Sequence, residues 1–287
     1  MHAYGDLATA YSARAASKYL CSTAPGATRI ASQAIETALT VRHGLAAAEA
    51  RAHLWLVDEH GLGTLGDPHR PPPRPEQAPY WRASAPTWAR QADGTTAPLA
   101  ALVEHIRPSV LIGVSGQYGL FTPPVLRAVA AHHERPVIFA LSNPDDHAEC
   151  TALTAYAATD GRAIFASGGP SLPVSVPGGT TGRAASAVPF HYDAAAARYP
   201  AQVNNAFIFP AVSRAAASGR VHQITDRMLL AGAEALAALV TAEDLAMGRV
   251  LPPIQALAQA IGTVAAALID AASADGPADP APPKIEL

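Results

Sequence analysis

The sequence predicts an α/β fold: a doubly wound, mostly parallel sheet with helices on both faces and extra helices near the C-terminal end. Short apolar runs are the first observation, at residues 54–57, 110–114, 136–141 and 163–166. Their lack of polar alternation is typical of strands buried on both faces. Helical stretches lie before the first run and between the later ones, at residues 27–50, 123–133 and 147–158. Strands that alternate with helices favour a parallel sheet.

The remaining segments are assigned in chain order. Residues 1–20 are rich in alanine and are predicted to be a helical N-terminal segment, followed by a turn at Cys21–Gly26. The main domain spans residues 21–273, with variable loops at 63–98, which holds many prolines, and at 175–202. Further helices are expected at 205–218, 227–239 and 254–272, before a disordered tail rich in Pro and Ala at 274–287.

Composition narrows the function classes. A length of 287 residues suits one large domain or two small ones. The net charge of −3 argues against a polybasic nucleic-acid or membrane binder. No apolar run reaches about 18 residues, so no transmembrane helix is expected, and residues 1–17 do not resemble a signal peptide. Two cysteines, Cys21 and Cys150, cannot form a disulfide framework, which favours the cytoplasm.

The carboxyl ends of parallel strands are where such sheets bind ligands. The segments that follow the strands are therefore the candidate site: Cys21–Gly26, Asp58–Gly61, Ser115–Phe121, Ser142–Asp146 and Ser167–Pro170. Lysine is rare, and Lys18 is the candidate for lysine-based catalysis because Lys284 lies in the tail.

Several stretches, taken together and in order, resemble the cofactor-binding domain of malic enzymes. They include LWLVDEHGL (54–62), RPSVLIGVSGQYGLFT (107–122), ERPVIFALSNPDDHAECT (134–151), GRAIFASGGPSLPV (161–174) and VNNAFIFPAV (203–212). The resemblance covers roughly residues 50–272. It implies a Rossmann-type domain that binds NAD or NADP, with the malate site at its seam with an N-terminal domain.

The resemblance also implies roles for individual residues. Asp58 would accept hydrogen bonds from the adenosine ribose, and Gly26 and Ser115 are the other cofactor-binding candidates. Glu59 stands where NADP-using relatives often carry Ser, and its charge would repel a 2′-phosphate and favour NAD. Asn143 and Asn205 match the two asparagines with which the family holds its substrate.

The glycine loop departs from the family. The family's first strand leads into Gly-Ala-Gly-x-Ala-Gly, whereas this chain has Cys21-Ser22-Thr23-Ala24-Pro25-Gly26. Loss of the first two glycines should weaken a dinucleotide site, since they allow a tight turn and close approach of pyrophosphate. Two interpretations stay open: a lost or remodelled cofactor site, and a divergent loop that still binds NAD.

The length is a second departure. A malic enzyme carries its tyrosine acid, lysine base and two of its metal-binding carboxylates in a preceding domain, for which this chain has no room. Asp6 is the nearest match to the later metal-binding aspartate, and Lys18 does not fall where the base would lie. A divalent metal site is therefore not expected, because hard cations need several oxygen ligands.

The segment between Val174 and Asn204 is longer than in the family. Its Gly178–Arg183 stretch has the residue types that cradle anions, although a solvated loop is the alternative. His191, Tyr192 and Asp193 are acid–base candidates, again with a surface loop as the alternative. The apolar helices at 231–240 and 256–268 suggest a subunit interface and hence a homo-oligomer.

Three hypotheses follow. The first is an NAD-dependent oxidoreductase or decarboxylase of a malate-like 2-hydroxy acid, incomplete alone, with missing groups supplied by a partner chain. The second is a repurposed, cofactor-independent enzyme that uses the old pocket for a cyclisation, hydration, isomerisation or decarboxylation of a small oxygenated metabolite. The third is a non-catalytic subunit of a partner enzyme.

Overall fold

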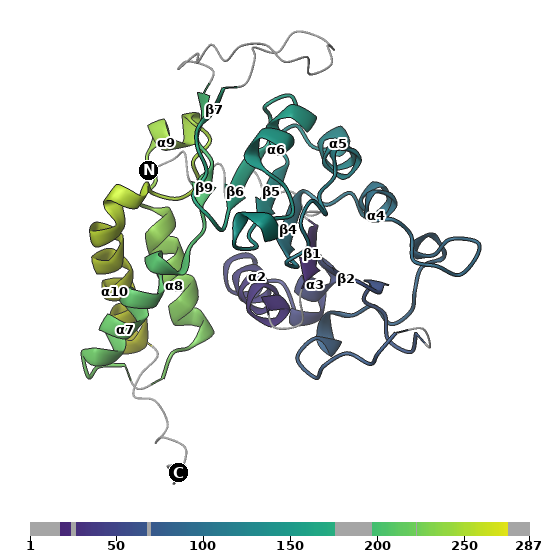
Figure 1. Ribbon diagram of the computed structural model, residues 1–287. Coiled ribbons are helices and arrows are strands. Elements are labelled where there is room, and N and C mark those ends of the chain that lie inside the picture. Colours follow the sequence, from purple (N-terminus) through teal and green to yellow (C-terminus); the bar gives the residue numbers. More distant parts are fainter. Residues whose placement is uncertain (1–17, 24–26, 68–69, 176–196, 222, 275–287) are drawn as a thin grey trace.

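A seven-stranded sheet forms the centre of the molecule (Figure 1). The computed structural model describes residues 18–23, 27–67, 70–175, 197–221 and 223–274. The strand order is β3-β2-β1-β4-β5-β6-β9, and every pair is parallel except β2 with β3. The strands are β1 (Tyr19–Thr23), β2 (Leu54–Asp58), β3 (Gly61–Leu62), β4 (Val110–Val114), β5 (Val137–Ala140), β6 (Ile164–Ser167) and β9 (Ala201–Gln202). The predicted mostly parallel α/β sheet is confirmed.

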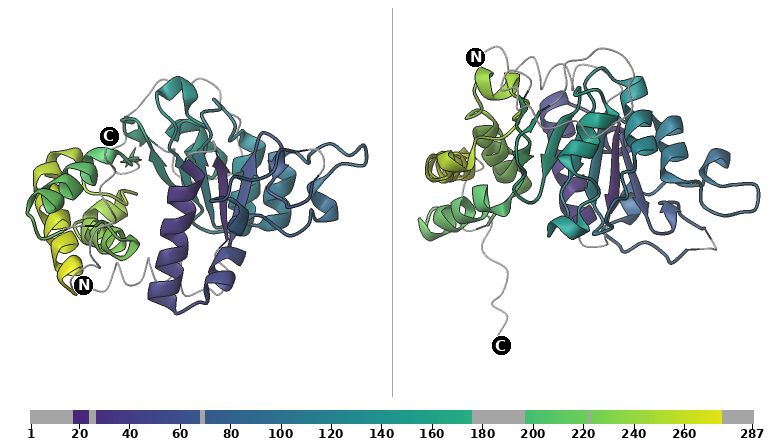
Figure 2. Two further views of the ribbon diagram at one scale, coloured as in Figure 1. Left: turned by 90° about the horizontal axis from the view of Figure 1, so that it is seen from below. Right: turned by 45° about the horizontal axis from the view of Figure 1, so that its top comes forward.

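Helices cover both faces of this sheet (Figure 2). One face is covered by α2 (Ala27–His43) and α3 (Ala47–Ala52), and the other by α4 (Leu99–Ile106), α5 (Pro123–His132) and α6 (Ala152–Ala158). A helical block lies beyond β9 and consists of α7 (Phe209–Ala217), α8 (Asp226–Ala237), α9 (Ala242–Ala246) and α10 (Leu257–Ala274). The chain therefore has the doubly wound arrangement and the extra C-terminal helices that the sequence predicts.

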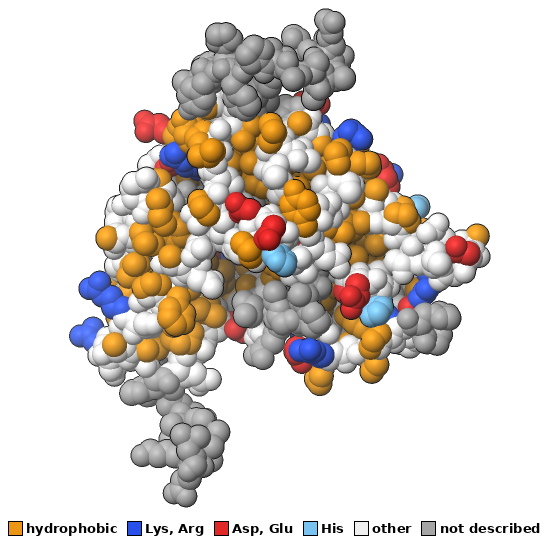
Figure 3. All heavy atoms as spheres, viewed as in Figure 1, with side chains coloured by type: hydrophobic (Ala, Val, Ile, Leu, Met, Phe, Trp, Pro, Cys, Tyr) orange, Lys and Arg blue, Asp and Glu red, His pale blue; other side chains and the backbone are white. Residues whose placement is uncertain are grey.

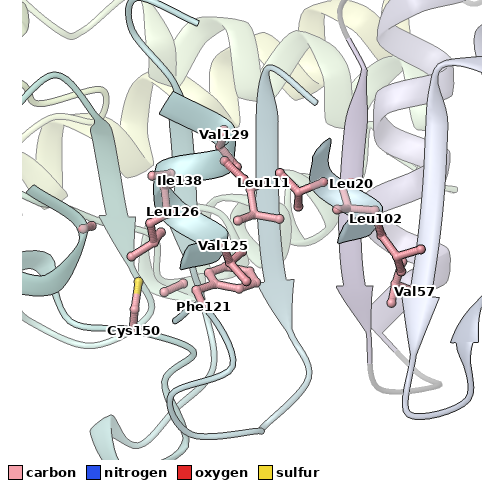
Figure 4. Close-up of a cluster of buried hydrophobic side chains, with 14 of the residues drawn as sticks. Leu20, Val57, Leu102, Leu111, Phe121, Val125, Leu126, Val129, Ile138 and Cys150 are labelled. Carbon is pink, nitrogen blue, oxygen red and sulfur yellow. The ribbon is translucent and has the colours of Figure 1, made fainter. Parts of the chain in front are cut away.

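Strand register explains why the apolar runs have no polar alternation. Leu20, Leu111, Ile138 and Phe165 are paired across β1, β4, β5 and β6 and are fully buried in a cluster that includes residues of α4, α5 and α6. Figure 4 shows the first three of them together with Leu102 of α4 and Leu126 of α5. The next residues of β1, β4 and β5 are Cys21, Ile112 and Phe139, which belong to a separate cluster that includes Ile35 of α2. Both faces of the sheet therefore need apolar side chains. Full burial of each such side chain contributes about 1.5–3 kcal/mol.

The helical block has its own core, centred on Phe207, Met228, Val264 and Leu268. Ion-pair and hydrogen-bond contacts join α8 to α2: the Arg42 guanidinium binds the Glu234 carboxylate, and the Gln33 amide donates to Asp226 at 2.6 Å. The block is thus fixed to the helical layer as well as to the sheet edge.

The segment Ile254–Ala274 is long and apolar enough to cross a membrane by length and composition, with a mean hydropathy of 1.5. Gln255, Gln259 and Asp270 interrupt the segment, so it is not a continuous apolar run of the kind on which the prediction of no transmembrane helix was based. The same segment contributes Val264 and Leu268 to the core of the block, and core helices of soluble proteins meet the same criteria. Hydrophobic side chains are common on the surface of the block in the view of Figure 3.

Several boundaries differ from the prediction. Tyr19 and Leu20, expected in a helix, and Cys21–Thr23, expected in a turn, form the central strand β1. Pairing with β2 and β4 on both sides imposes this state on a run too short to signal a strand. The predicted helix at 27–50 is divided at Gly44, where φ is +67°. The helix expected from His147 begins at Ala152, after a separate 3₁₀ turn at Asp145–His147.

The two variable loops contain more order than predicted. Within 63–98, Arg70 and Tyr80 are buried, and Arg82 lies 3.7 Å above the Trp55 ring. Two 3₁₀ turns, η1 (Ala78–Tyr80) and η2 (Thr87–Ala89), also lie there. The loop expected at 175–202 supplies strand β9, and β7 (Val174–Ser175) pairs with β8 (Ala197–Arg198).

Candidate functional site

The carboxyl ends of β1, β2 and β4 enclose a cavity of about 180 Å³. The strand order reverses between β1 and β4, which is where open α/β sheets bind ligands. Its polar lining consists of Ser22, Asp58, Glu59, Thr96, Ser115 and Gln117, and its apolar lining includes Leu99, Leu102 and Leu120. We call this the Asp58 cavity. It brings together two of the three cofactor-binding candidates, Asp58 and Ser115.

Asp58 ends strand β2 and is held by groups of its own chain. Its Oδ2 atom accepts a hydrogen bond from the Arg70 guanidinium, and its Oδ1 atom accepts one from the His60 amide at 2.9 Å. The Asp58 side chain remains 27% exposed. A carboxylate offers about four lone pairs, so two acceptor positions on Asp58 are left for a ligand.

Arg70 is a residue of this site that the sequence did not indicate. Its side chain is only 2% exposed, and it also donates to the Leu62 carbonyl at 2.7 Å and lies 4.0 Å from the Trp81 ring centroid. A second cavity of about 250 Å³ adjoins the first, sharing Asp58 and Ser115 and adding Arg74. An arginine in a proline-rich loop has no spacing that would link it to a strand end.

Glu149 is the second residue whose role the sequence did not reveal. A helix-start position fits its place in the sequence, but α6 begins later, with Thr151 as its N-cap. The Glu149 carboxylate is fully buried and accepts hydrogen bonds from the Ser115 amide and hydroxyl, both at 2.8 Å. It also accepts one from the Ser142 hydroxyl at 2.6 Å. The Ser115 amide is therefore committed to Glu149 and is not offered to a ligand.

The two predicted substrate asparagines follow neighbouring strands. Asn143 lies three residues after Ala140 of β5, and Asn205 lies three residues after Gln202 of β9. Ala140 and Gln202 each pair with Ser167 of β6, so the two positions share one edge with one strand between them. Both side chains are exposed. Parallel neighbours about 4.8 Å apart put the two strands roughly 10 Å from each other.

Small residues make room for Asn143. A Cβ atom at Gly168 would collide with the Asn143 amide nitrogen and the Leu141 carbonyl, and one at Gly169 would lie 3.2 Å from Asn143 Oδ1. The segment after β6 therefore supports the asparagine directly, which explains the Gly-Gly pair in a strand-end loop.

Lys18 lies at the amino end of the central strand β1, opposite the end of the sheet that forms the Asp58 cavity. It precedes β1, and its carbonyl accepts hydrogen bonds from Ser109 and Val110 at the start of β4. Five residues of strand span about 16 Å, so the lysine is placed away from the carboxyl-end cavity. The structure therefore does not bring Lys18 to the Asp58 cavity, and its catalytic role stays a prediction.

Five of the predicted site residues lie outside the described residues: Gly26, Asp6, His191, Tyr192 and Asp193. Among the residues that are described, no group of three His, Cys, Asp or Glu side chains comes together to hold a metal ion.

Burial changes the acidity of two side chains near the site. Cys21 lies next to Ser22 in β1, and burial raises the pKa of its thiol to about 12. Cys150 follows Glu149, and burial, with a smaller contribution from the Glu149 carboxylate, raises the pKa of its thiol to about 12. Both are protonated core residues at neutral pH rather than nucleophiles.

Comparison with known proteins gives a consistent family. The family described as "Malic enzyme, NAD binding domain" matches residues 16–273. The NADP-dependent malic enzyme of Sus scrofa is 36% identical over 216 residues, which are 75% of this chain and 34% of that protein. The chloroplastic NADP-dependent malic enzyme of Zea mays is 35% identical over 242 residues, 83% of this chain and 33% of that protein.

A solved structure shows the same fold. The malic enzyme of Entamoeba histolytica superposes with a TM-score of 0.58 at 17% identity, covering 95% of this chain and 46% of that one. The chain spans about a third of the length of the curated relatives it matches. Because the family match extends over most of the chain, this protein belongs to the malic enzyme NAD-binding domain family.

Proposed function

We propose that this chain is the dinucleotide-binding part of a malic-enzyme-like oxidoreductase that acts on a malate-like 2-hydroxy acid. The observation that carries the proposal is the Asp58 cavity at the strand-order reversal, on the same sheet edge as Asn143 and Asn205. Asp58 accepts hydrogen bonds from the adenosine ribose, with adenine against Leu99, Leu102 and Leu120. A bound nicotinamide supplies the acceptor for the hydride that leaves the hydroxyl-bearing carbon.

In this proposal, Asn143 and Asn205 bind the hydroxy acid. A neutral amide donates hydrogen bonds to a carboxylate without adding a buried charge. Asn143 and Asn205 are both exposed. Each lies three residues beyond a strand residue that pairs with Ser167, so both lie at the carboxyl end of the sheet. The acid, base and metal of the full reaction come, in this proposal, from outside the described residues, and a partner chain is one source.

Titration with NADH tests the proposal. NADH fluorescence should increase and saturate on addition of the chain, with NADPH titrated in parallel to decide between the cofactors. Asp58→Asn should weaken binding about ten-fold or more, since it removes a charged acceptor worth about 1.5–3 kcal/mol. Asp93→Asn, an exposed loop carboxylate outside the cavity, is the control. No binding at millimolar NADH and NADPH would contradict the proposal.

A repurposed enzyme without a nicotinamide is the second candidate. Two observations favour it: Arg70 already binds the Asp58 carboxylate, and Glu149 already occupies the Ser115 amide. Such an enzyme turns over its substrate without added NAD or NADP, and that turnover falls in Asn143→Ala and Asn205→Ala. Unchanged turnover in both variants would show that the old pocket is not the site.

A further inference from the structure

Glu149 connects two loops that serve different halves of the proposed site. Ser115 follows β4 and lines the Asp58 cavity. Ser142 follows β5 and immediately precedes Asn143. Both serine hydroxyls and the Ser115 amide donate to Glu149 Oε1, at 2.6–2.8 Å. One carboxylate oxygen is therefore the common acceptor for the cofactor loop and the substrate loop.

A further hydrogen bond joins the same two loops. The Gly116 amide donates to the Ser142 hydroxyl oxygen at 2.9 Å, while that hydroxyl donates to Glu149. The loops thus form a closed arrangement of Ser115, Gly116, Ser142 and Glu149. Networks of this kind hold their members in one geometry only when all members are satisfied.

The surroundings of Glu149 are built for the carboxylate itself. It is fully buried, and in the described part of the chain its hydrogen-bond partners are serine hydroxyls and backbone amides. Strand β4 carries Gly113 beside it, where a Cβ atom would lie 2.5 Å from Glu149 Cδ. A buried carboxylate is costly unless it is fully hydrogen-bonded. Its presence at this junction points to a positional role.

We propose that Glu149 is a positioning residue that couples the dinucleotide pocket to the hydroxy-acid pocket, an inference that rests on the function proposed above. A ligand that fixes the Ser115 loop also fixes the acceptor of the Ser142 loop. The Asn143 loop then loses less freedom when the second ligand binds. The two ligands therefore raise each other's affinity, by the same factor in both directions.

The test measures NADH affinity by fluorescence with and without saturating L-malate. In the unmodified chain, malate should tighten NADH binding about five-fold or more. In Glu149→Gln, which keeps the shape but replaces one acceptor oxygen by an amide, the two NADH affinities should agree within about two-fold. Ser142→Ala removes the hydrogen bonds that the hydroxyl makes with Glu149 and Gly116 but keeps those from Ser115 to Glu149, so it should give an intermediate ratio. Glu104→Gln, an exposed carboxylate of α4 paired with His132, should leave the ratio unchanged.

The ratio separates positioning from a purely structural role. A structural role lowers the melting temperature and weakens NADH binding equally in both conditions, so the ratio stays at its original value and overturns the inference. A ratio near one in the unmodified chain overturns it as well while leaving the proposed function in place. Failure of the unmodified chain to bind NADH overturns both.

Discussion

At the scale of single residues, Arg70 fixes the carboxylate that ends strand β2. Replacement by methionine keeps most of the buried stem but leaves the Asp58 carboxylate and the Leu62 carbonyl without their donor. We predict that Arg70→Met lowers the free energy of unfolding by about 2–3 kcal/mol, less than for a fully buried pair because Asp58 is partly exposed.

Urea unfolding of matched variants checks this prediction. Arg74→Met changes an exposed arginine of the same loop and should cost about 0.5 kcal/mol or less. The double variant Arg70→Met with Asp58→Asn should recover part of the loss, since no unpaired charge remains. Equal effects of the two single arginine variants would contradict the importance of the Arg70–Asp58 pair.

The two cysteines give a second prediction. Burial raises the thiol pKa of both to about 12, so almost no thiolate exists at pH 8. A thiol-reactive dye should label neither cysteine in the native chain and both in denaturant. The folded chain holds the thiol protons more tightly than the unfolded chain does. The free energy of unfolding therefore keeps the full contribution of the two thiols below pH 9 and loses it as the pH rises from 9 to 12. Rapid labelling of either cysteine in the native chain would contradict the burial of the two thiols.

The candidate segments at the strand ends could be predicted because parallel sheets bind ligands beyond the carboxyl ends of their strands. Asp58 and Ser115 line one cavity, and Asn143 lies on the same edge. The contacts of Arg70 and Glu149 could not be predicted because their partners are distant in sequence: Arg70 binds Asp58, 12 residues earlier, and Glu149 binds Ser115, 34 residues earlier. Only the folded chain shows that a buried carboxylate serves both loops.

At the scale of elements, α8 and α10 approach closely at Gly232. A Cβ atom there would lie 3.2 Å from Val264 Cγ1 and 3.4 Å from Leu268 Cδ2. We predict that Gly232→Val lowers the free energy of unfolding by about 1–3 kcal/mol by overpacking this contact. Gly262→Ala is the matched change in α10, where a Cβ atom meets nothing within 4 Å.

Gly262→Ala should instead raise the free energy of unfolding by about 0.5–1 kcal/mol, because alanine favours the helix. Thermal unfolding of both variants checks the pair. Opposite shifts of the melting temperature are expected, and a stabilising Gly232→Val would show that the helices have room to separate.

Elements with strong local signals were the predictable ones. Strands β4, β5 and β6 were recognised as continuous apolar runs. Strand β1 was missed because Ser22 and Thr23 end its short apolar run, and pairing on both sides determines its conformation. Strand β9 was missed because two residues are too few for a period, and it forms only by pairing with β6.

At the scale of the whole molecule, the helical block presents large hydrophobic side chains to solvent. Phe209 is 70% exposed and Ile254 is 46% exposed, and only 22% of the apolar window within Ile254–Ala274 is buried. We predict that the chain self-associates through this block, and that Phe209→Ser with Ile254→Ser shifts it toward the monomer. Leu172→Ser, at an 85% exposed position after β6, should have no effect.

Sedimentation velocity over a range of protein concentrations measures this self-association. A dimer or larger species that weakens only in the double variant is expected. A clean monomer of the unmodified chain would contradict the interface that the apolar helices suggest.

The sheet ends at both sides in strands of two residues, β3 and β9. β3 runs antiparallel to its neighbour, and the helical block lies beyond β9. An edge this short offers a foreign strand few unpaired amide and carbonyl groups. The central strands, which are apolar and would be prone to amyloid-like stacking if exposed, are thereby kept away from any open edge. The fold thus resists edge-to-edge aggregation even though its surface carries hydrophobic side chains.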